Sequence, residues 1–143
     1  MTQPIYEHKQ TGVAMMILVG IPLVILIAGA PLPPVLCVLA ILAAVMVIFH
    51  SMTVRVDEET VSLHFGPGAF RRAFPVQQIH AARAVRNSWW HGLGIHFFPG
   101  GMVYNVSGLS AVELLLENGR RVRIGSDEPE ALARAVEEAL ARR

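Results

Sequence analysis

The apolar residues of this chain gather in two long runs near its N-terminus. No Asp, Glu, Lys or Arg occurs between Lys9 and Arg55, and the apolar runs cover residues 13–30 and 35–49. The second run can be extended through residue 52. A helix rises about 1.5 Å per residue, so the first run would span about 27 Å, close to the hydrocarbon core of a bilayer. The pattern predicts two membrane-spanning helices.

A cluster of breakers separates the two runs. Pro31, Pro33 and Pro34 lack the backbone N–H that a continuing helix needs, so the chain is expected to reverse there. This predicts a tight two-helix transmembrane hairpin over residues 13–50. The alternative is a cleaved signal peptide, because residues 28–30 have the small side chains of a cleavage site.

The distribution of arginines predicts the orientation of this hairpin. Its loop carries no charge, whereas Arg55, Arg71 and Arg72 follow the second helix. Cytoplasmic flanks are enriched in Lys and Arg, so both termini are expected on the cytoplasmic side. The many Ala, Arg, Gly and Pro residues, with few Lys, suggest a bacterial protein. Together with the two predicted spans, this gives an expected localisation in the inner membrane.

From residue 51 onward, apolar and polar residues alternate with a period of two, as in half-buried strands. Strands are predicted at residues 52–56, 61–65, 69–74, 79–86, 93–98, 102–106, 111–117 and 120–124. The pair Asn118-Gly119 favours a type I′ turn, in which both residues adopt positive φ. Asp127 is expected to cap a final helix that contains Pro129, and Leu132, Val136 and Leu140 would share its apolar face.

These elements define three segments and one fold class. Residues 1–12 are expected to form a cytoplasmic N-terminal segment, residues 13–50 the transmembrane hairpin, and residues 51–143 a separate domain. The predicted class is an α+β membrane protein, with an antiparallel β-barrel or sandwich and one C-terminal amphipathic helix behind the hairpin.

The order of elements resembles small bacterial membrane proteins in which a two-helix anchor precedes a pleckstrin-homology-like (PH-like) domain. The resemblance rests on residues 53–57, 91–96, 104–108, 111–114 and 123–129. It implies a PH-like barrel on the membrane, and it implies no catalytic residues.

The chemistry-bearing residues form no recognisable catalytic or metal-binding motif. His64, His80, His91 and His96 follow no zinc-ligand spacing, and the single Cys37 lies in the second apolar run. No nucleophile elbow or phosphate-binding glycine loop occurs. We therefore expect a protein that is not an enzyme, with no metal and no cofactor.

One stretch combines basic and aromatic residues. The predicted rim for a membrane or a ligand consists of Arg71, Arg72, Arg83, Arg86, Trp89 and Trp90. Tryptophan and arginine favour the headgroup region of a bilayer, and adjacent aromatics point to opposite faces of a strand. The alternative is that one tryptophan fills the core while the arginines form a solvated face.

These observations lead to two functional hypotheses. The first is a non-enzymatic, membrane-anchored PH-like module that binds proteins, or lipid headgroups, at the cytoplasmic face. The second is a small accessory subunit of a larger membrane complex, in which Gly12, Gly20, Ala28 and Ala43 allow close helix packing. The expected partners are the lipid bilayer and either a membrane protein or further copies of this chain, and no nucleic acid.

Overall fold

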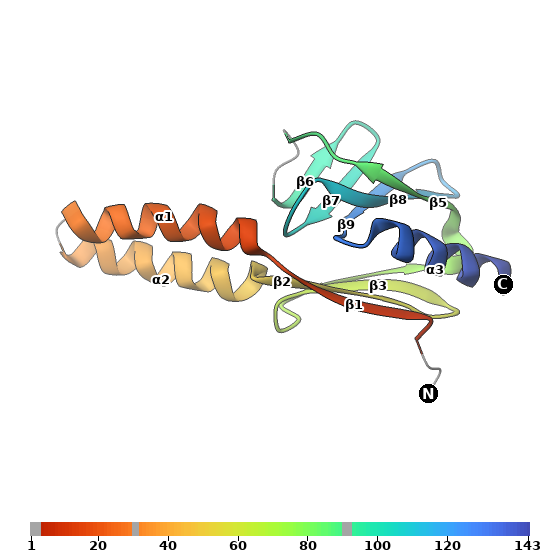
Figure 1. Cartoon of the computed structure of the whole chain (residues 1–143), viewed down its shortest axis with the longest axis horizontal. Coiled ribbons are helices and arrows are strands. Elements are labelled where there is room, and N and C mark those ends of the chain that lie inside the picture. Colours follow the sequence, from red (N-terminus) through yellow and green to blue (C-terminus); the bar gives the residue numbers. More distant parts are fainter. Residues whose placement is uncertain (1–3, 30–31, 90–92) are drawn as a thin grey trace.

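A helical hairpin projects from one end of a domain built from two β-sheets (Figure 1). The computed structural model describes residues 4–29, 32–89 and 93–143. The hairpin consists of α1 (Val13–Gly29) and α2 (Leu32–Phe49). The first sheet has the strand order β1-β2-β3-β4, with β1 (Tyr6–Thr11), β2 (Ser51–Val56), β3 (Thr60–Phe65) and β4 (Phe70–Pro75).

The second sheet has the strand order β5-β8-β9-β7-β6. Its strands are β5 (Ile79–Arg86), β6 (Gly94–Phe98), β7 (Gly101–Asn105), β8 (Ser110–Leu116) and β9 (Arg121–Gly125), and a short 3₁₀ turn, η1 (Val76–Gln78), leads into it. The strands β7 and β9 run parallel, whereas the other neighbouring strands of both sheets are antiparallel. The expectation of purely antiparallel pairing is therefore wrong at this position.

The prediction of two membrane spans is contradicted. Helix α1 has 17 residues and α2 has 18, which corresponds to about 26 and 27 Å against a hydrocarbon core of about 30 Å. None of the described helices is long and apolar enough to cross a membrane. The predicted class of α+β membrane protein is corrected to an α+β fold with two sheets, and the inner-membrane localisation with two spans and cytoplasmic termini loses its basis.

The hairpin is inserted between two paired strands. Strand β1 lies within the predicted segment 1–12, and it pairs with β2 from Tyr6 opposite Val56 to Thr11 opposite Ser51. Beyond this last pair, the N–H of Gly12 donates to the carbonyl of His50 at 2.6 Å. The two ends of the hairpin are thus held side by side by the first sheet.

Each strand predicted from the period-two pattern overlaps an observed strand, but β1 was not foreseen. Its sequence, YEHKQT, has no apolar alternation, and the strand it pairs with lies beyond both helices. The buried residue of β1 is the polar Gln10, which is 4% exposed. Its side-chain oxygen accepts a hydrogen bond from the backbone N–H of Asp127. This long-range contact leaves no local signal in the sequence.

The hairpin of β8 and β9 has a different turn from the one expected. Both central residues of a type I′ turn need positive φ, yet among the described residues only glycines have it, including Gly119 at 78°. The N–H of Gly119 donates to the carbonyl of Leu116, and the N–H of Leu116 donates to the carbonyl of Arg120. The loop therefore has three residues instead of two, which places Glu113 opposite Arg123.

The final helix, α3 (Pro129–Ala141), closes one side of the space between the sheets (Figure 1). It contacts β5, β8 and β2 through a face that includes Leu132, Val136 and Ala139. The predicted cap is wrong by one residue, because Glu128 is the N-cap and makes no side-chain capping bond. Asp127 instead binds the His8 ring at 2.8 Å and ties β1 to the start of this helix.

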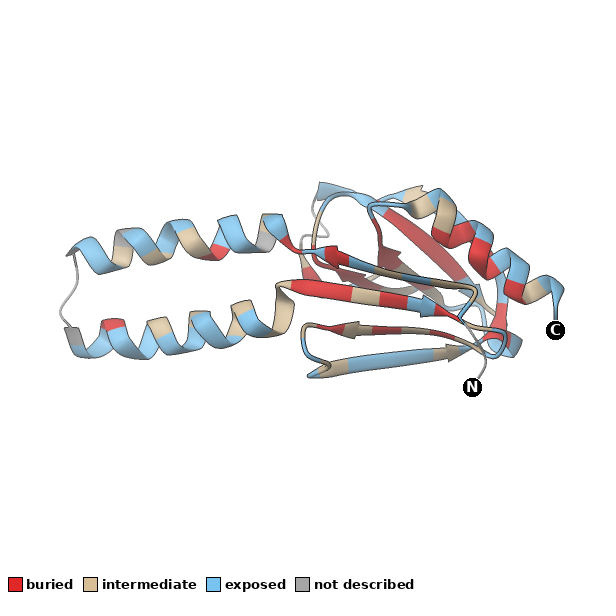
Figure 2. Cartoon of the chain, turned by 60° about the horizontal axis from the view of Figure 1, so that its bottom comes forward, coloured by how far each residue is buried: buried red, intermediate tan, exposed pale blue. Residues whose placement is uncertain are grey.

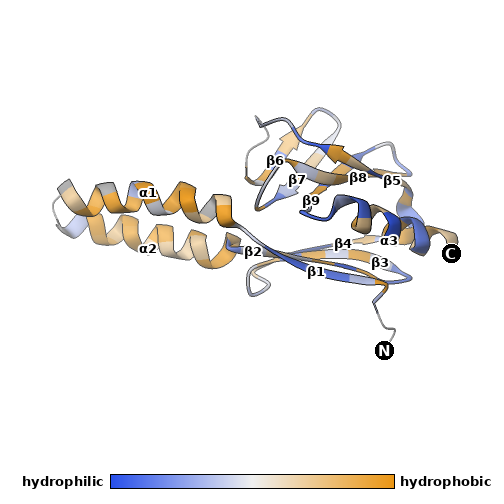
Figure 3. Ribbon diagram, in the orientation of Figure 1, coloured by the Kyte–Doolittle hydropathy of each residue, from blue (hydrophilic) through white to orange (hydrophobic). Residues whose placement is uncertain are grey.

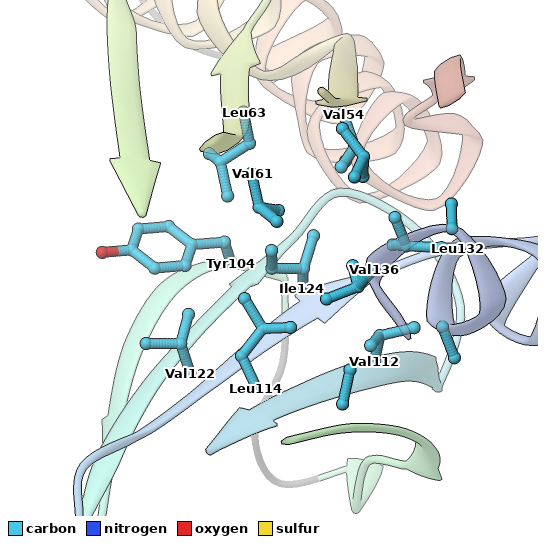
Figure 4. Close-up of a cluster of buried hydrophobic side chains, with 14 of the residues drawn as sticks. Val54, Val61, Leu63, Tyr104, Val112, Leu114, Val122, Ile124, Leu132 and Val136 are labelled. Carbon is cyan, nitrogen blue, oxygen red and sulfur yellow. The ribbon is translucent and has the colours of Figure 1, made fainter. Parts of the chain in front are cut away.

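The core lies between the two sheets and α3 (Figure 4). Val54, Val61 and Leu63 come from the first sheet, and they meet Leu114 and Ile124 from the second. On the side opposite α3, Tyr104 is buried with its ring 6.3 Å from those of both Phe70 and Phe74 on β4. This aromatic contact holds β4 against the second sheet.

Candidate functional site

The most unusual surface of the molecule is the helical hairpin, which is apolar around its whole circumference (Figures 2 and 3). The large exposed apolar side chains are Val13, Met16, Ile17, Leu18, Ile21, Val24 and Ile27 on α1, and Leu36, Val38, Ile41 and Val47 on α2. Among the hydrophobic residues described on these helices, only Val19 and Val35 are buried. A helix that is apolar on all sides is typical of a buried environment.

The size of this surface indicates that the isolated hairpin is incomplete. A large apolar side chain contributes about 1.5–3 kcal/mol when it is fully buried, so a half-exposed one forgoes roughly 1 kcal/mol. For the hairpin this sums to the order of 10 kcal/mol, similar to the whole stability of a small domain. Contiguous apolar patches of such size mark interaction sites.

The apolar surface continues from the base of the hairpin onto the domain. A hollow of about 240 Å³ is lined by Ala14 of α1 and by Trp89, Leu93, Gly108 and Leu109. Trp89 is 66% exposed, so its side chain offers a broad ring next to the first turn of α1. A partner seated on the hairpin would also reach this tryptophan.

The residues predicted to form a basic rim are divided between the two sheets. Arg71 and Arg72 lie on β4 of the first sheet, whereas Arg83 and Arg86 lie on β5 of the second. Trp89 follows β5 and lines the hollow at the hairpin base. Trp90 lies outside the described residues.

The structure brings Arg83 together with a carboxylate that the sequence analysis had not singled out. Glu113 on β8 is 3% exposed, and it accepts hydrogen bonds from Nε of Arg83 at 3.1 Å and from Nε of Arg123 at 2.8 Å. Arg121 lies 3.9 Å away. The guanidinium groups of Arg121 and Arg123 also lie over the Phe98 ring, at 5.1 and 4.7 Å from its centre.

The arginines keep this carboxylate ionised. Burial raises the pKa of Glu113, but the hydrogen bonds and charges of Arg123 and Arg83 outweigh that effect and hold the pKa below its ordinary value. The cluster joins three strands of the second sheet through their outward face. Its signal in the sequence is a glutamate between the apolar residues Val112 and Leu114, with arginines alternating on the next strand.

The small residues proposed to allow close packing have different surroundings. A Cβ on Gly12 would lie 2.8 Å from the carbonyl oxygen of Phe49, so this glycine serves the junction of the hairpin with the sheet. A Cβ on Gly20 would meet nothing within 4 Å. Gly20 therefore leaves room on the outside of α1 for another chain.

No group of three or more metal-ligating side chains occurs in the part of the chain that the structure describes. The free Cys37 is exposed on α2 and has no neighbouring ligand set among those residues. The residues described here thus offer an apolar surface and a structural ion cluster.

No protein-family model matches this chain, and none of the curated proteins matches it either. The PH-like resemblance therefore remains a prediction from the sequence.

Proposed function

We propose that this protein is a non-enzymatic interaction module that assembles with other protein chains through its apolar helical hairpin. The observation that carries the proposal is the exposure of large apolar side chains along both α1 and α2 (Figure 2). Burial of this surface supplies a driving force on the order of 10 kcal/mol, enough to offset much of the entropic cost of association.

The geometry also favours more than one partner helix. A single helix packed against the hairpin would cover one face and leave the others exposed, because the apolar residues surround both helices. Helices of partner chains on several sides would bury the whole surface, as in the interior of a helix bundle. The two-sheet domain would remain at one end of this assembly, where the hairpin enters it (Figure 1).

The test is to purify the protein from native cells in a mild detergent and to measure the protein mass of the purified particle, without the detergent. Size-exclusion chromatography with light scattering should find the chain in a defined oligomer or a defined complex with another protein. Replacing Ile17, Ile21 and Val24 on α1 with glutamine should dissociate the assembly, because it puts polar groups in a buried contact. Phe97→Gln is the matched control, since Phe97 is an 81% exposed apolar residue on β6 and belongs to neither helix of the hairpin.

Two outcomes would contradict the proposal. One is a chain that remains monomeric in detergent at all concentrations. The other is a monomer that associates with protein-free lipid vesicles through the same three residues of α1, since the hairpin would then be covered by lipid instead of protein.

A further inference from the structure

The open edge of β4 carries backbone groups available for pairing. The strand lies at the end of the first sheet and pairs only with β3. The N–H of Val76 donates to the carbonyl of Glu59 in the same register. Hydrogen-bonded pairs recur at every second residue of an antiparallel ladder. Arg71 and Ala73 therefore direct their N–H and C=O groups away from β3, toward the open edge.

A groove lies beside this edge, between the two sheets. Its volume is about 220 Å³, and its apolar lining includes Phe74 of β4, Met102 and Tyr104 of β7, and Val122 of β9. It opens on the side of the domain opposite α3, where Tyr104 points toward β4 (Figure 4). Small-molecule sites usually measure about 300–1,000 Å³, so the groove suits one or two apolar side chains better than a whole ligand.

The surroundings of the groove are basic. Arg72 and Arg120 are among its lining residues, Arg71 is exposed on the same strand, and no carboxylate lines it in the described part of the chain. The opposite edge of the first sheet differs, because Glu7 on β1 offsets Lys9 and the strand lies beside Asp127 and Glu128 of the α3 terminus. Charge therefore distinguishes β4 as the edge that attracts an acidic chain.

We infer that the β4 edge binds an extended, acidic segment of a partner polypeptide, which adds a fifth strand to the first sheet and places an apolar side chain in the groove. Successive side chains of a strand point to opposite faces. In a segment that alternates acidic and apolar residues, the apolar ones would face Phe74 and Tyr104. The acidic ones would lie on the outer face beside Arg71.

The outer face next to β4 also suits a carboxylate. A hollow of about 380 Å³ is lined there by Ser62, His64 and Arg71. Arg71 is held by a hydrogen bond from its Nε to the carbonyl of Gly68, which fixes the guanidinium beside the open edge. This inference concerns an edge strand of the first sheet and no residue of α1 or α2, so it does not depend on the proposed assembly.

The test is fluorescence anisotropy with the full-length chain in mild detergent and a fluorescein-labelled peptide of alternating glutamate and leucine. The peptide should bind saturably, while the matched peptide of alternating lysine and leucine should not. Ala73→Pro removes a backbone N–H from the open edge. It should weaken peptide binding by about tenfold, which corresponds to the loss of one backbone hydrogen bond. Circular dichroism should show that this variant keeps its β-structure, since proline is tolerated on edge strands.

A second pair of variants tests the charge. Arg71→Glu should weaken binding of the acidic peptide by at least about tenfold, whereas Arg86→Glu makes the same charge change on β5 and should leave it unchanged. Binding that is equal for wild type and Ala73→Pro, or equal for Arg71→Glu and Arg86→Glu, would overturn the inference. So would failure of the acidic peptide to bind. A concentration-dependent dimer that Ala73→Pro abolishes would also overturn it, because the edge would then bind a second copy.

Discussion

Among single residues, Glu113 is the buried carboxylate that Arg83, Arg121 and Arg123 surround on the outer face of the second sheet. A buried carboxylate is tolerated only when its charge is paired and its oxygen atoms accept hydrogen bonds. Arg83 and Arg123 satisfy both needs. Arg83 is 70% exposed and Arg123 only 17%, so solvent screens the first pair and the second is the stronger one.

Glu113→Gln should reduce stability at neutral pH and make it less sensitive to acid. The pKa of Glu113 is lowered in the folded protein. The carboxylate therefore stabilises the fold above its unfolded-state pKa, and this contribution is lost as the pH falls through the lowered folded-state value. The glutamine variant should lose roughly 2–3 kcal/mol at pH 7, because charge-assisted hydrogen bonds are lost around a buried site.

Urea denaturation of both proteins at pH 7 and at a series of pH values below about 4.3, the ordinary pKa of a glutamate, measures this difference. Glu137→Gln on the exposed face of α3 is the control, and it should change stability by less than about 0.5 kcal/mol. If the difference between wild type and Glu113→Gln stays constant down to strongly acidic pH, the account of the Glu113 charge is wrong.

For individual elements, local sequence patterns predicted most strands and the final helix, but not the pairing of strands that are distant in the sequence, such as β1 with β2, β5 with β8 and β7 with β9. The Asn118-Gly119 pair located a β-hairpin correctly, because glycine there allows positive φ. The loop length could not be read from the same pair. One extra residue shifts the register, and that shift brings Glu113 opposite Arg123 instead of Ile124. The ion cluster was therefore hidden until the turn was known.

Gly119→Val should destabilise the domain through the turn alone. Gly119 has φ of 78°, and a Cβ there would meet nothing within 4 Å, so the cost is backbone strain without a clash. A β-branched residue at positive φ costs roughly 1–3 kcal/mol. Gly119→Asn should cost clearly less, since asparagine tolerates this region. Thermal melts that rank the two variants equally would show that the glycine conformation is not required.

The two helices show which features apolar composition can predict and which it cannot. The apolar runs at residues 13–30 and 35–49 predicted two neighbouring helices, and the structure has them as Val13–Gly29 and Leu32–Phe49. The predicted boundary is wrong at the second helix, because Pro33 and Pro34 lie in its first turn, where a missing N–H is tolerated. The environment that covers them was assigned wrongly, because apolar composition does not fix a helix's length. The described helices are shorter than a span requires.

At the scale of the whole molecule, the sequence could not show which residues of the predicted rim share one surface, because its arginines belong to different sheets. Arg71 and Arg83 are close along the chain, but β4 and β5 end up in separate sheets. Which residues share a surface depends on how the sheets pack through Tyr104, Phe70 and Phe74. Such packing is a tertiary property with no local period in the sequence.

The domain should fold without its hairpin when residues 13–49 are replaced by Asn-Gly. Gly12 and His50 are already joined by a backbone hydrogen bond, which is the closing pair that a two-residue turn requires. The Phe49 ring, 5.3 Å from that of Phe65, is lost, so the melting temperature should fall by a few degrees, as expected for about 1 kcal/mol. A variant without a cooperative thermal transition would contradict this separation.

The junction at Gly12 and His50 also makes the length of the helical hairpin independent of the strand register of the first sheet. The pairing of Thr11 with Ser51 is set by the sheet. Adding or removing whole helical turns at the far tip therefore changes the reach of the hairpin by about 5 Å per turn and leaves every strand register intact. The length of the hairpin can therefore be changed by design while the domain that holds it stays the same.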